Sequence, residues 1–178
     1  VFAGTNPNNG KRYVYLETLG GGMGARFTKD GKDGVQVHLT NTSNLPVEAI
    51  EMEYPLRVEE YSFVENSGGA GKYRGGLGIR RIIRPIGHKC EFSGVGERFK
   101  HSPWGVFGGQ PGKPGKFYLK HKNEQITNLS SKSSSIFTNE NDAIVMETPG
   151  AGGYGNPKKR TKNNLLQDKI SGKFSNSF

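Results

Sequence analysis

Short runs of alternating apolar and polar residues recur along the chain, separated by clusters of glycine, proline and asparagine. Alternation with a period of two is typical of strands that have one buried face, and turn residues between the runs favour short strands. The pattern predicts a mainly β fold, with a β-rich α+β fold as the alternative. The predicted strands are Tyr13–Glu17, Val35–Thr40, Leu56–Phe63, Ile79–Ile86, Lys89–Ser93, Lys116–Lys120, Gln125–Thr127 and Ala143–Met146.

Helical periodicity is sparse, and it predicts one short C-terminal helix over Asn164–Ile170. In such a helix Leu165, Leu166 and Ile170 would share one side. The serine-rich run Ser130–Ser135 is expected to form a surface loop between two hairpin strands. We therefore expect strands joined by glycine-rich loops, with residues 1–156 as the body and residues 157–178 as a basic tail.

The chain has 178 residues, of which 27 are glycine, and this length suits one domain. It contains no long apolar run and no charged leader, so we expect a cytoplasmic protein that does not contact a membrane. Its single cysteine, Cys90, has no partner for an internal disulfide and is expected to pack in a strand as a small apolar side chain. Because Val1 is not an initiator methionine, we expect a fragment or a processed chain.

The formal net charge of +9 raises the question of a nucleic-acid partner. More than half of this charge lies in the tail, which has six basic residues and one acidic residue, Asp168. The body is closer to balance, so we predict no nucleic-acid partner and a tail that is solvated or docks on a protein. The six basic residues of the tail are Lys158, Lys159, Arg160, Lys162, Lys169 and Lys173.

Four glycine-rich clusters punctuate the chain. Glycine permits close approach of one backbone to another or to a ligand. No cluster continues into the Gly-Lys-Ser/Thr of a phosphate-binding loop, so we predict bulges and tight backbone crossings rather than nucleotide binding by this chain. The clusters are Gly20–Ala25, Ser67–Gly71, Arg74–Gly78 and Pro149–Gly155.

The richest group of candidate site residues lies between His38 and Glu48. His38 and Thr40 would share one face of the predicted strand Val35–Thr40, opposite an apolar face. Asn41, Asn44 and Glu48 would follow in a turn, where amides bind either a ligand or their own backbone.

We therefore predict His38 and Glu17 as catalytic residues and Thr40, Asn41, Asn44 and Glu48 as substrate-binding residues. Glu17 is included because it ends a predicted strand just before a triple glycine. The remaining histidines are scattered without the spacing of metal ligands, so no metal site is predicted. The chain also lacks a Gly-x-Ser-x-Gly elbow and any Cys/His pairing that would mark a covalent nucleophile.

Six strings of residues, in this order, resemble the C-terminal part of the hydantoinase B or 5-oxoprolinase family. Each string alone is weakly specific, whereas the ordered set is specific and runs almost the whole length of the chain. Ala151 departs from the pattern, which has glycine in the closing string. The strings are Tyr15–Ala25, Asp30–Val35, His38–Glu48, Ser67–Gly78, Gly105–Gly112 and Thr148–Pro157.

This resemblance implies a B-type component that works with a hydantoinase A-type ATPase subunit in a hetero-oligomer. Together such components use ATP and magnesium, bound on the A-type partner, to open a hydantoin, 5-oxoproline or lactam ring. The resemblance also implies a divalent metal in the N-terminal part of the B-type subunit, outside this chain, and no cofactor within it. The small cyclic amide would then meet a pocket that this chain helps to form.

Two alternatives share the same strings. The large subunits of acetone and acetophenone carboxylases are similar, and they activate a ketone and bicarbonate instead of hydrolysing a ring. A non-catalytic β-rich domain that only binds other subunits would also carry the strings. We therefore expect a piece that is inactive alone, and the chemistry of the whole assembly stays open at this point.

Overall fold

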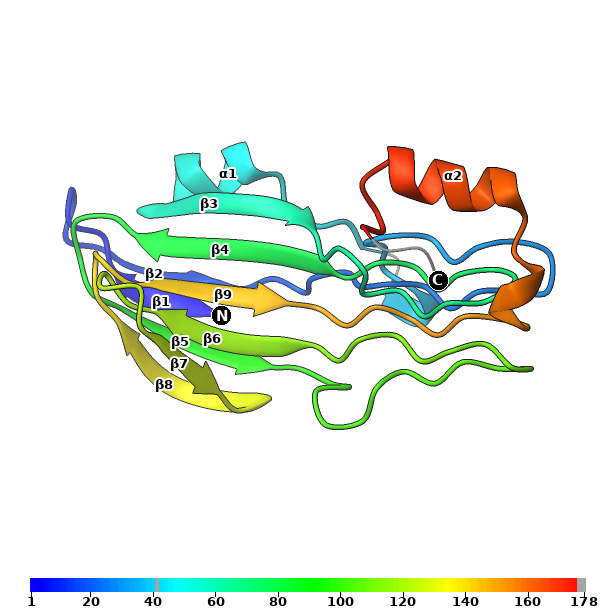
Figure 1. Cartoon of the computed structure of the whole chain (residues 1–178). Helices are drawn as coiled ribbons and strands as arrows, with labels where there is room; N and C mark the ends of the chain where they lie inside the picture. Colours follow the sequence, from blue (N-terminus) through cyan, green and yellow to red (C-terminus); the bar gives the residue numbers. More distant parts are fainter. Residues whose placement is uncertain (41, 176–178) are drawn as a thin grey trace.

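Residues 1–40 and 42–175, which the computed structural model describes, form nine strands and two α-helices (Figure 1). The mainly β fold predicted from the sequence is confirmed. The strands are β1 Phe2–Thr5, β2 Arg12–Tyr15, β3 Leu56–Phe63, β4 Ile79–Pro85, β5 Cys90–Val95, β6 Lys116–Lys120, β7 Ile126–Leu129, β8 Lys132–Thr138 and β9 Ala143–Glu147. The helices are α1 Val47–Glu53 and α2 Lys162–Ile170, with two short 3-10 turns at His38–Thr40 and Pro157–Lys159.

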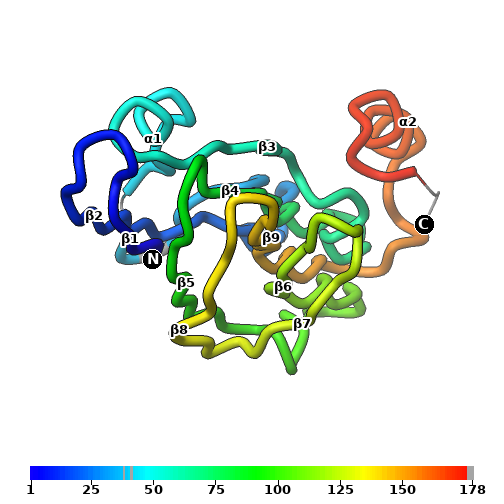
Figure 2. The backbone as a smooth tube through the Cα atoms, turned by 90° about the vertical axis from the view of Figure 1, so that its left-hand side faces the viewer, coloured from blue at the N-terminus to red at the C-terminus, as the bar shows by residue number. Residues whose placement is uncertain are grey.

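The strands form two antiparallel sheets that enclose the hydrophobic core. One sheet has the order β2-β1-β5-β8 and the other β3-β4-β9-β6-β7. Figure 2 shows the two sheets facing each other, with β7 and β8 joining them at one side. Phe2 and Phe92 of the first sheet meet Ile83, Phe117 and Ile144 of the second in a single cluster. We call this part of the molecule the strand half.

Alternation explains why β4 is a strand of the second sheet. Ile79, Arg81 and Ile83 are buried on one face, and the residues between them are partly exposed. Its neighbour β9 is buried at every position because it lies between β4 and β6 and is covered on both faces. Cys90 begins β5 at 2% exposure, as expected for a small apolar side chain, and burial raises the pKa of its thiol to about 12.

The other half of the molecule is built from glycine-rich segments that run side by side, and we call it the glycine bundle (residues 20–35, 67–78, 104–113 and 148–155). Gly76 donates a backbone hydrogen bond to Met23 and accepts one from Ala151, so three segments meet at one residue. A Cβ atom on Gly76 would overlap the carbonyl oxygen of Lys32. At such crossings the bundle packs backbone against backbone, and there is no room for a side chain at the crossing glycine.

The predicted strand Val35–Thr40 is wrong. Val35 makes one isolated bridge with Gly21, and the chain then turns into a 3-10 helix at His38–Thr40. The face expected to be buried is open, because Val37 is 43% and Leu39 is 86% exposed. Alternation in sequence indicates a strand only where a partner strand is available, and no partner extends beyond Val35 among the described residues.

The sequence pattern also missed α1, β1 and most of β8. In α1 only Ile50 is buried, so the helix is too short to show a helical stripe. The predicted serine loop is correct only for Ser130 and Ser131, since β8 begins at Lys132 and pairs with β5. Low complexity did not prevent this segment from completing the edge of a sheet.

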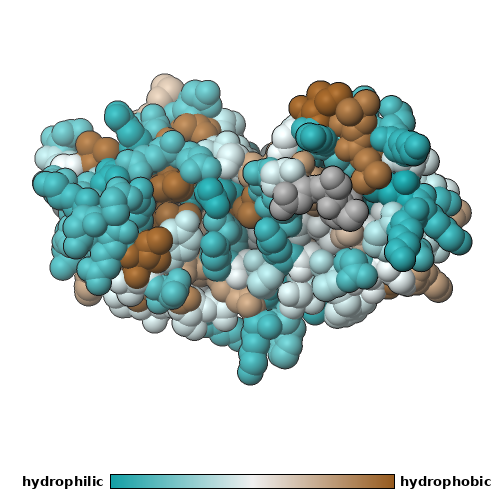
Figure 3. All heavy atoms as spheres, viewed as in Figure 1, coloured by the Kyte–Doolittle hydropathy of each residue, from teal (hydrophilic) through white to brown (hydrophobic). Residues whose placement is uncertain are grey.

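The predicted C-terminal helix is confirmed and extends two residues earlier, to Lys162. The side chain of Thr161 accepts a hydrogen bond from the backbone N–H of Asn164, which caps the first turn. The apolar residues Leu166 and Ile170 are not buried in the fold, since they are 53% and 69% exposed. Apolar atoms are accordingly visible over α2 in Figure 3, and the buried residue of the helix is Asp168.

Candidate functional site

Glu17 lies just after β2, and its carboxylate reaches inward to Arg81 of β4. The Arg81 side chain is fully buried, and its Nη1 lies 2.5 Å from Oε2 of Glu17, whose side chain is 8% exposed. The hydroxyl of Tyr15 donates to the same oxygen, and the backbone N–H of Leu45 donates to Oε1 at 2.6 Å. The ring of Tyr61 covers the guanidinium at 4.1 Å.

These contacts occupy both carboxylate oxygens of Glu17. Removing one partner of a buried ion pair leaves the other charge uncompensated and costs about 3–5 kcal/mol. Burial raises the pKa of Tyr15, and its hydrogen bond to Glu17 raises it further, so its hydroxyl remains a donor. Glu17 therefore has the geometry of an anchor between β2, β4 and the segment before α1, and its predicted catalytic role stays a prediction.

Asn44 lies beside this ion pair and joins three separate segments. Its Oδ1 accepts from the backbone N–H of Gly20 at 2.8 Å and from the Gln36 side chain at 3.2 Å. Its Nδ2 donates to the hydroxyl of Tyr61 at 2.9 Å. The predicted site residues Glu17 and Asn44 are thus brought together through Leu45 and Tyr61.

The other predicted site residues are placed differently. His38 and Thr40 begin and end the short 3-10 helix, and the Thr40 hydroxyl is exposed and donates to the carbonyl oxygen of Val37 at 3.2 Å. Asn41 lies outside the described residues. Glu48 lies in the first turn of α1 rather than in the predicted turn, and it is exposed.

Sequence reasoning missed Arg81, Gln36 and Tyr61 in this cluster. For Arg81 a signal was present, because an arginine between Ile79 and Ile83 occupies the buried face of a strand and needs a buried carboxylate. Gln36 and Tyr61 offer no such signal, since polar residues alternate at many surface strands. Among the described residues, Nε of Arg81 is buried without a hydrogen-bond partner.

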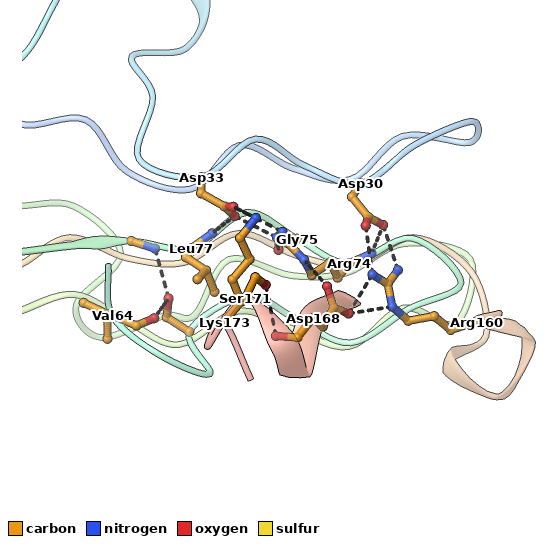
Figure 4. Close-up of polar contacts among 12 residues, drawn as sticks. Asp30, Asp33, Val64, Arg74, Gly75, Leu77, Arg160, Asp168, Ser171 and Lys173 are labelled. Carbon is orange, nitrogen blue, oxygen red and sulfur yellow. Dashed lines mark hydrogen bonds and ion pairs between the residues drawn. The ribbon is translucent and has the colours of Figure 1, made fainter. Parts of the chain in front are cut away.

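A second buried polar cluster joins the glycine bundle to α2, and we call it the α2 latch (Asp30, Asp33, Arg74, Arg160 and Asp168). Arg74 binds Asp33 through Nη1 at 2.7 Å and Asp168 through Nε at 3.0 Å. Arg160 binds the other oxygen of Asp168 at 2.7 Å and Asp30 at 2.8 Å. Figure 4 shows the two arginines meeting at Asp168 of α2.

The electrostatics of the α2 latch are those of a structural network. Burial alone would raise the pKa of Asp30 and Asp33, but hydrogen bonds from Arg160 and Arg74 hold both below the ordinary aspartate range. Arg74 and Arg160 are 4% and 6% exposed. The carboxylates are therefore engaged by arginines and, at Asp33, also by Lys173 at 2.9 Å, and the latch offers no free acid or base.

The described residues do not provide a metal site. Within residues 1–40 and 42–175, no three His, Cys, Asp or Glu side chains are grouped so that they could hold an ion. His121 contacts one carboxylate and one hydroxyl: its Nδ1 lies 3.4 Å from Asp142, and its Nε2 lies 3.0 Å from the hydroxyl of Thr127. We derive no step through a metal in this chain.

In the same part of the chain, no helix is long and apolar enough to cross a membrane.

Known proteins with similar sequences point to one family. Residues 1–157 match the model of the Hydantoinase B/oxoprolinase family. An uncharacterized protein of Methanocaldococcus jannaschii is 46% identical over 159 residues, which cover 89% of this chain and 28% of that protein. The putative B-type subunit of a D-/L-hydantoinase from a Pseudomonas strain is 34% identical, covering 97% of this chain and 29% of the relative.

Plant and structural relatives agree with this placement. The 5-oxoprolinase 1 of Arabidopsis thaliana is 39% identical over 80% of this chain and 11% of its own length. The crystal structure of an ATP-dependent caprolactamase from Pseudomonas jessenii superposes with a TM-score of 0.79 at 25% identity, covering 97% of this chain and 31% of that one. An acetone carboxylase structure gives 0.77 at 20% identity, with 97% and 27% coverage, and shows the fold alone.

The chain spans less than a third of the length of each of these relatives. The match to the family model extends through both sheets, the ion pair of Glu17 and Arg81, and the glycine bundle. The strings that resembled this family in the sequence include segments that build the bundle and the segment that carries Asn44. The chain therefore belongs to the Hydantoinase B/oxoprolinase family.

Proposed function

We propose that this chain is part of the B-type component of an enzyme that opens a cyclic amide at the expense of ATP. The observation that carries the proposal is the joint likeness of sequence and fold. The family match covers residues 1–157, and the fold likeness to an ATP-dependent caprolactamase covers 97% of the chain. A relative named as the B-type component of a hydantoinase supports a multi-component assembly with an A-type partner.

The chemistry requires activation because an amide carbon is a poor electrophile. Transfer of a phosphoryl group from ATP to the amide oxygen makes that oxygen a good leaving group. One water adds to the activated carbon, and collapse of the adduct breaks the C–N bond of the ring, so that the nitrogen leaves as a protonated amine or amide and an acyl phosphate remains. A second water hydrolyses the acyl phosphate, so the products are the ring-opened carboxylate, ADP and phosphate. We place ATP on the A-type partner, since the glycine clusters of this chain are filled by backbone contacts.

We further propose that the surface around Asn44 is one wall of the pocket for the ring or its phosphorylated form. Asn44 and Gln36 are neutral amides held in place by their mutual hydrogen bond, which suits a surface facing a neutral ring, and Tyr61 adds a half-exposed aromatic face. Thr40 would extend this wall, with Glu48 at its edge on α1, and on sequence grounds we propose His38 and Asn41 for the same pocket. Glu17 would act by holding Leu45 and Arg81 in position rather than by moving a proton.

The experiment is reconstitution of the assembled enzyme with ATP and three candidate rings, namely hydantoin, 5-oxoproline and caprolactam. Ring opening coupled to ADP formation is expected for at least one of them, and none when ATP is left out. Incorporation of labelled bicarbonate into acetone, without ring opening, would instead assign the assembly to carboxylation. The isolated chain is expected to release no phosphate from ATP, and turnover by it would overturn the placement of ATP.

The wall is tested by His38→Ala and Asn41→Ala in the assembled enzyme, with His101→Ala as a control at an exposed position. Loss of a transition-state contact lowers kcat/KM by about tenfold or more, whereas the control keeps the activity of the unchanged enzyme. Glu17→Gln is expected to lower the free energy of unfolding as well as activity. Full activity of folded His38→Ala and Asn41→Ala variants would remove these residues from the site.

A further inference from the structure

The end of the glycine bundle farthest from the strand half exposes aromatic side chains. Two turns finish there, one at residues 26–29 and one at residues 106–109, as the right-hand end of Figure 1 shows. Each turn presents a phenylalanine, with Phe27 72% exposed and Phe107 79% exposed. We call these two turns, together with Lys72 and residues 154–159, the bundle end.

The backbone at Phe107 is unfavourable for the residue that occupies it. Gly109 donates to the carbonyl oxygen of Val106 at 2.9 Å, which closes a tight turn around Phe107 and Gly108. Phe107 has a φ of 51° and Gly108 a φ of 89°, so both central residues are in the left-handed region. Such a turn favours asparagine, aspartate or glycine at its first central position, and a bulky residue there is strained.

This strain brings the Phe107 side chain no burial within the chain. Its ring contacts Tyr154, with centroids 5.1 Å apart, yet most of its surface remains open to solvent. A residue that strains its backbone and is not buried is explained when its side chain packs elsewhere in the assembled protein. The observation therefore indicates a contact surface at the bundle end.

The exposed charges at the bundle end have one sign. Lys29, Lys72, Lys158 and Lys159 are exposed. The carboxylate of Asp30, next to Lys29 in the chain, is engaged by Arg160 in the α2 latch. In Figure 3 hydrophilic side chains surround this end of the molecule. A complementary surface would offer an apolar recess for the two rings and carboxylates around it.

We propose that the bundle end docks into an acidic-rimmed apolar recess formed by the remaining polypeptide of the B-type component. The relatives carry at least about two-thirds of their length outside the region that this chain matches, so members of the family have further polypeptide that could form such a surface. A surface in the same polypeptide is present at a high effective concentration, which favours it over a separate subunit. This inference rests on the proposed function only in taking the chain as part of a longer B-type component.

The first test is hydroxyl-radical footprinting of the full-length B-type polypeptide against the 178-residue chain. Phe27 and Phe107 are expected to be oxidised about fivefold more slowly in the full-length protein, because a packed interface excludes water. Phe137, which is 56% exposed on β8, is the internal control and should react equally in both. Equal oxidation of Phe107 in both proteins would overturn the proposal.

Other occupants give other outcomes, and each contradicts the proposal. Protection that appears only after the A-type component is added assigns the surface to that component. Protection that grows with the concentration of the isolated chain assigns it to a second copy. Protection by single-stranded nucleic acid with a steep salt dependence assigns it to a nucleic-acid partner. Ring-opening activity is measured separately, so failure of the docking proposal and failure of the proposed function are distinguishable.

The second test exploits the strain at Phe107. Phe107→Asn places a residue that tolerates positive φ in the turn, so the thermal midpoint of the isolated chain should stay equal or rise. In the full-length polypeptide the same change removes a packed ring, and the midpoint should fall by about 3 °C or more. The control Met52→Asn, at a position 87% exposed on α1, should shift both proteins alike. A fall of the same size in both proteins for Phe107→Asn would make the ring a purely local contact.

Discussion

The strand half and the glycine bundle reach a folded state by opposite means. In the strand half, side chains such as Phe92 and Ile83 fill the space between two sheets, and the backbone stays at the usual distance between strands. In the glycine bundle the backbones themselves fill the space, as at Gly76 and Gly69. The stability of the strand half therefore comes from packed side chains. The stability of the glycine bundle comes from close backbone contacts, which glycine permits, and from the ion pairs of the α2 latch.

The largest expected effect comes from breaking the α2 latch. Arg74→Ala removes a buried guanidinium and leaves Asp33 with Lys173 alone and Asp168 with Arg160 alone, so the free energy of unfolding should fall by about 3 kcal/mol. The control is Arg84→Ala in the strand half, whose ion pair with Glu59 is partly exposed and contributes about 0–1 kcal/mol. Urea unfolding measures both. Equal losses would show that the latch is no more important than a surface pair.

The next effect probes backbone packing directly. Gly76→Ala places a Cβ atom on the carbonyl oxygen of Lys32, and we expect a loss of about 3 kcal/mol because two segments must move apart. Gly24→Ala is the matched control, since its Cβ would meet nothing within 4 Å. At such a site alanine reduces the entropy of the unfolded chain and stabilises by about 0.4–1 kcal/mol. The same sign for both variants would refute backbone packing as the organising principle of the bundle.

A smaller loss is expected from a matched change in the strand half. Ile83→Val removes one buried methyl group and should lower the free energy of unfolding by about 1 kcal/mol. Ile126→Val, at a position 56% exposed on β7, should change it by less than about 0.5 kcal/mol. The side-chain core should thus tolerate the loss of a methyl group better than the bundle tolerates an added one. Thermal melts of Gly76→Ala, Ile83→Val and Ile126→Val test this order of destabilisation.

The smallest expected effect is that of acid, which should release α2 while the strand half remains folded. The pKa values of Asp30 and Asp33 are lowered in the fold, so their stabilisation is complete above the unfolded value near 3.9 and is lost as pH falls through the folded values. Helix α2 should therefore loosen before the strand half opens. A thiol reagent that works in acid should leave Cys90 unlabelled at that stage. Labelling of Cys90 at the same pH as α2 release would mean that the two halves unfold as one unit.

The sequence predicted the strand half well because alternation records burial on one face. β3, β4, β5 and β6 carry that record, whereas β9 is a mostly apolar run that is buried at every position. It failed at Val35–Thr40, where the alternation had no partner strand, and at α1, where a single buried residue leaves no helical pattern. The glycine clusters were correctly expected to be close backbone crossings, but their arrangement depends on contacts between distant segments.

The candidate site was less predictable than the fold. Glu17 and Asn44 do lie together, but the residues that hold them, Arg81 and Tyr61, come from strands far along the chain. His38 and Thr40 were assigned to a strand face that does not exist. Side-chain chemistry within one segment is visible in a sequence, whereas the partner that engages each group is set by the tertiary fold.

The glycine bundle also has a consequence in genetic terms. At Gly31, Gly75 and Gly76 any added Cβ would overlap a backbone carbonyl of a neighbouring segment. Every amino-acid replacement adds at least that atom, so each nonsynonymous codon change at these positions is damaging whatever the chemistry of the new side chain. Natural variation at such positions therefore reports on geometry and carries no information about substrate, whereas variation around Asn44 would follow a change of ring if the proposed wall is correct.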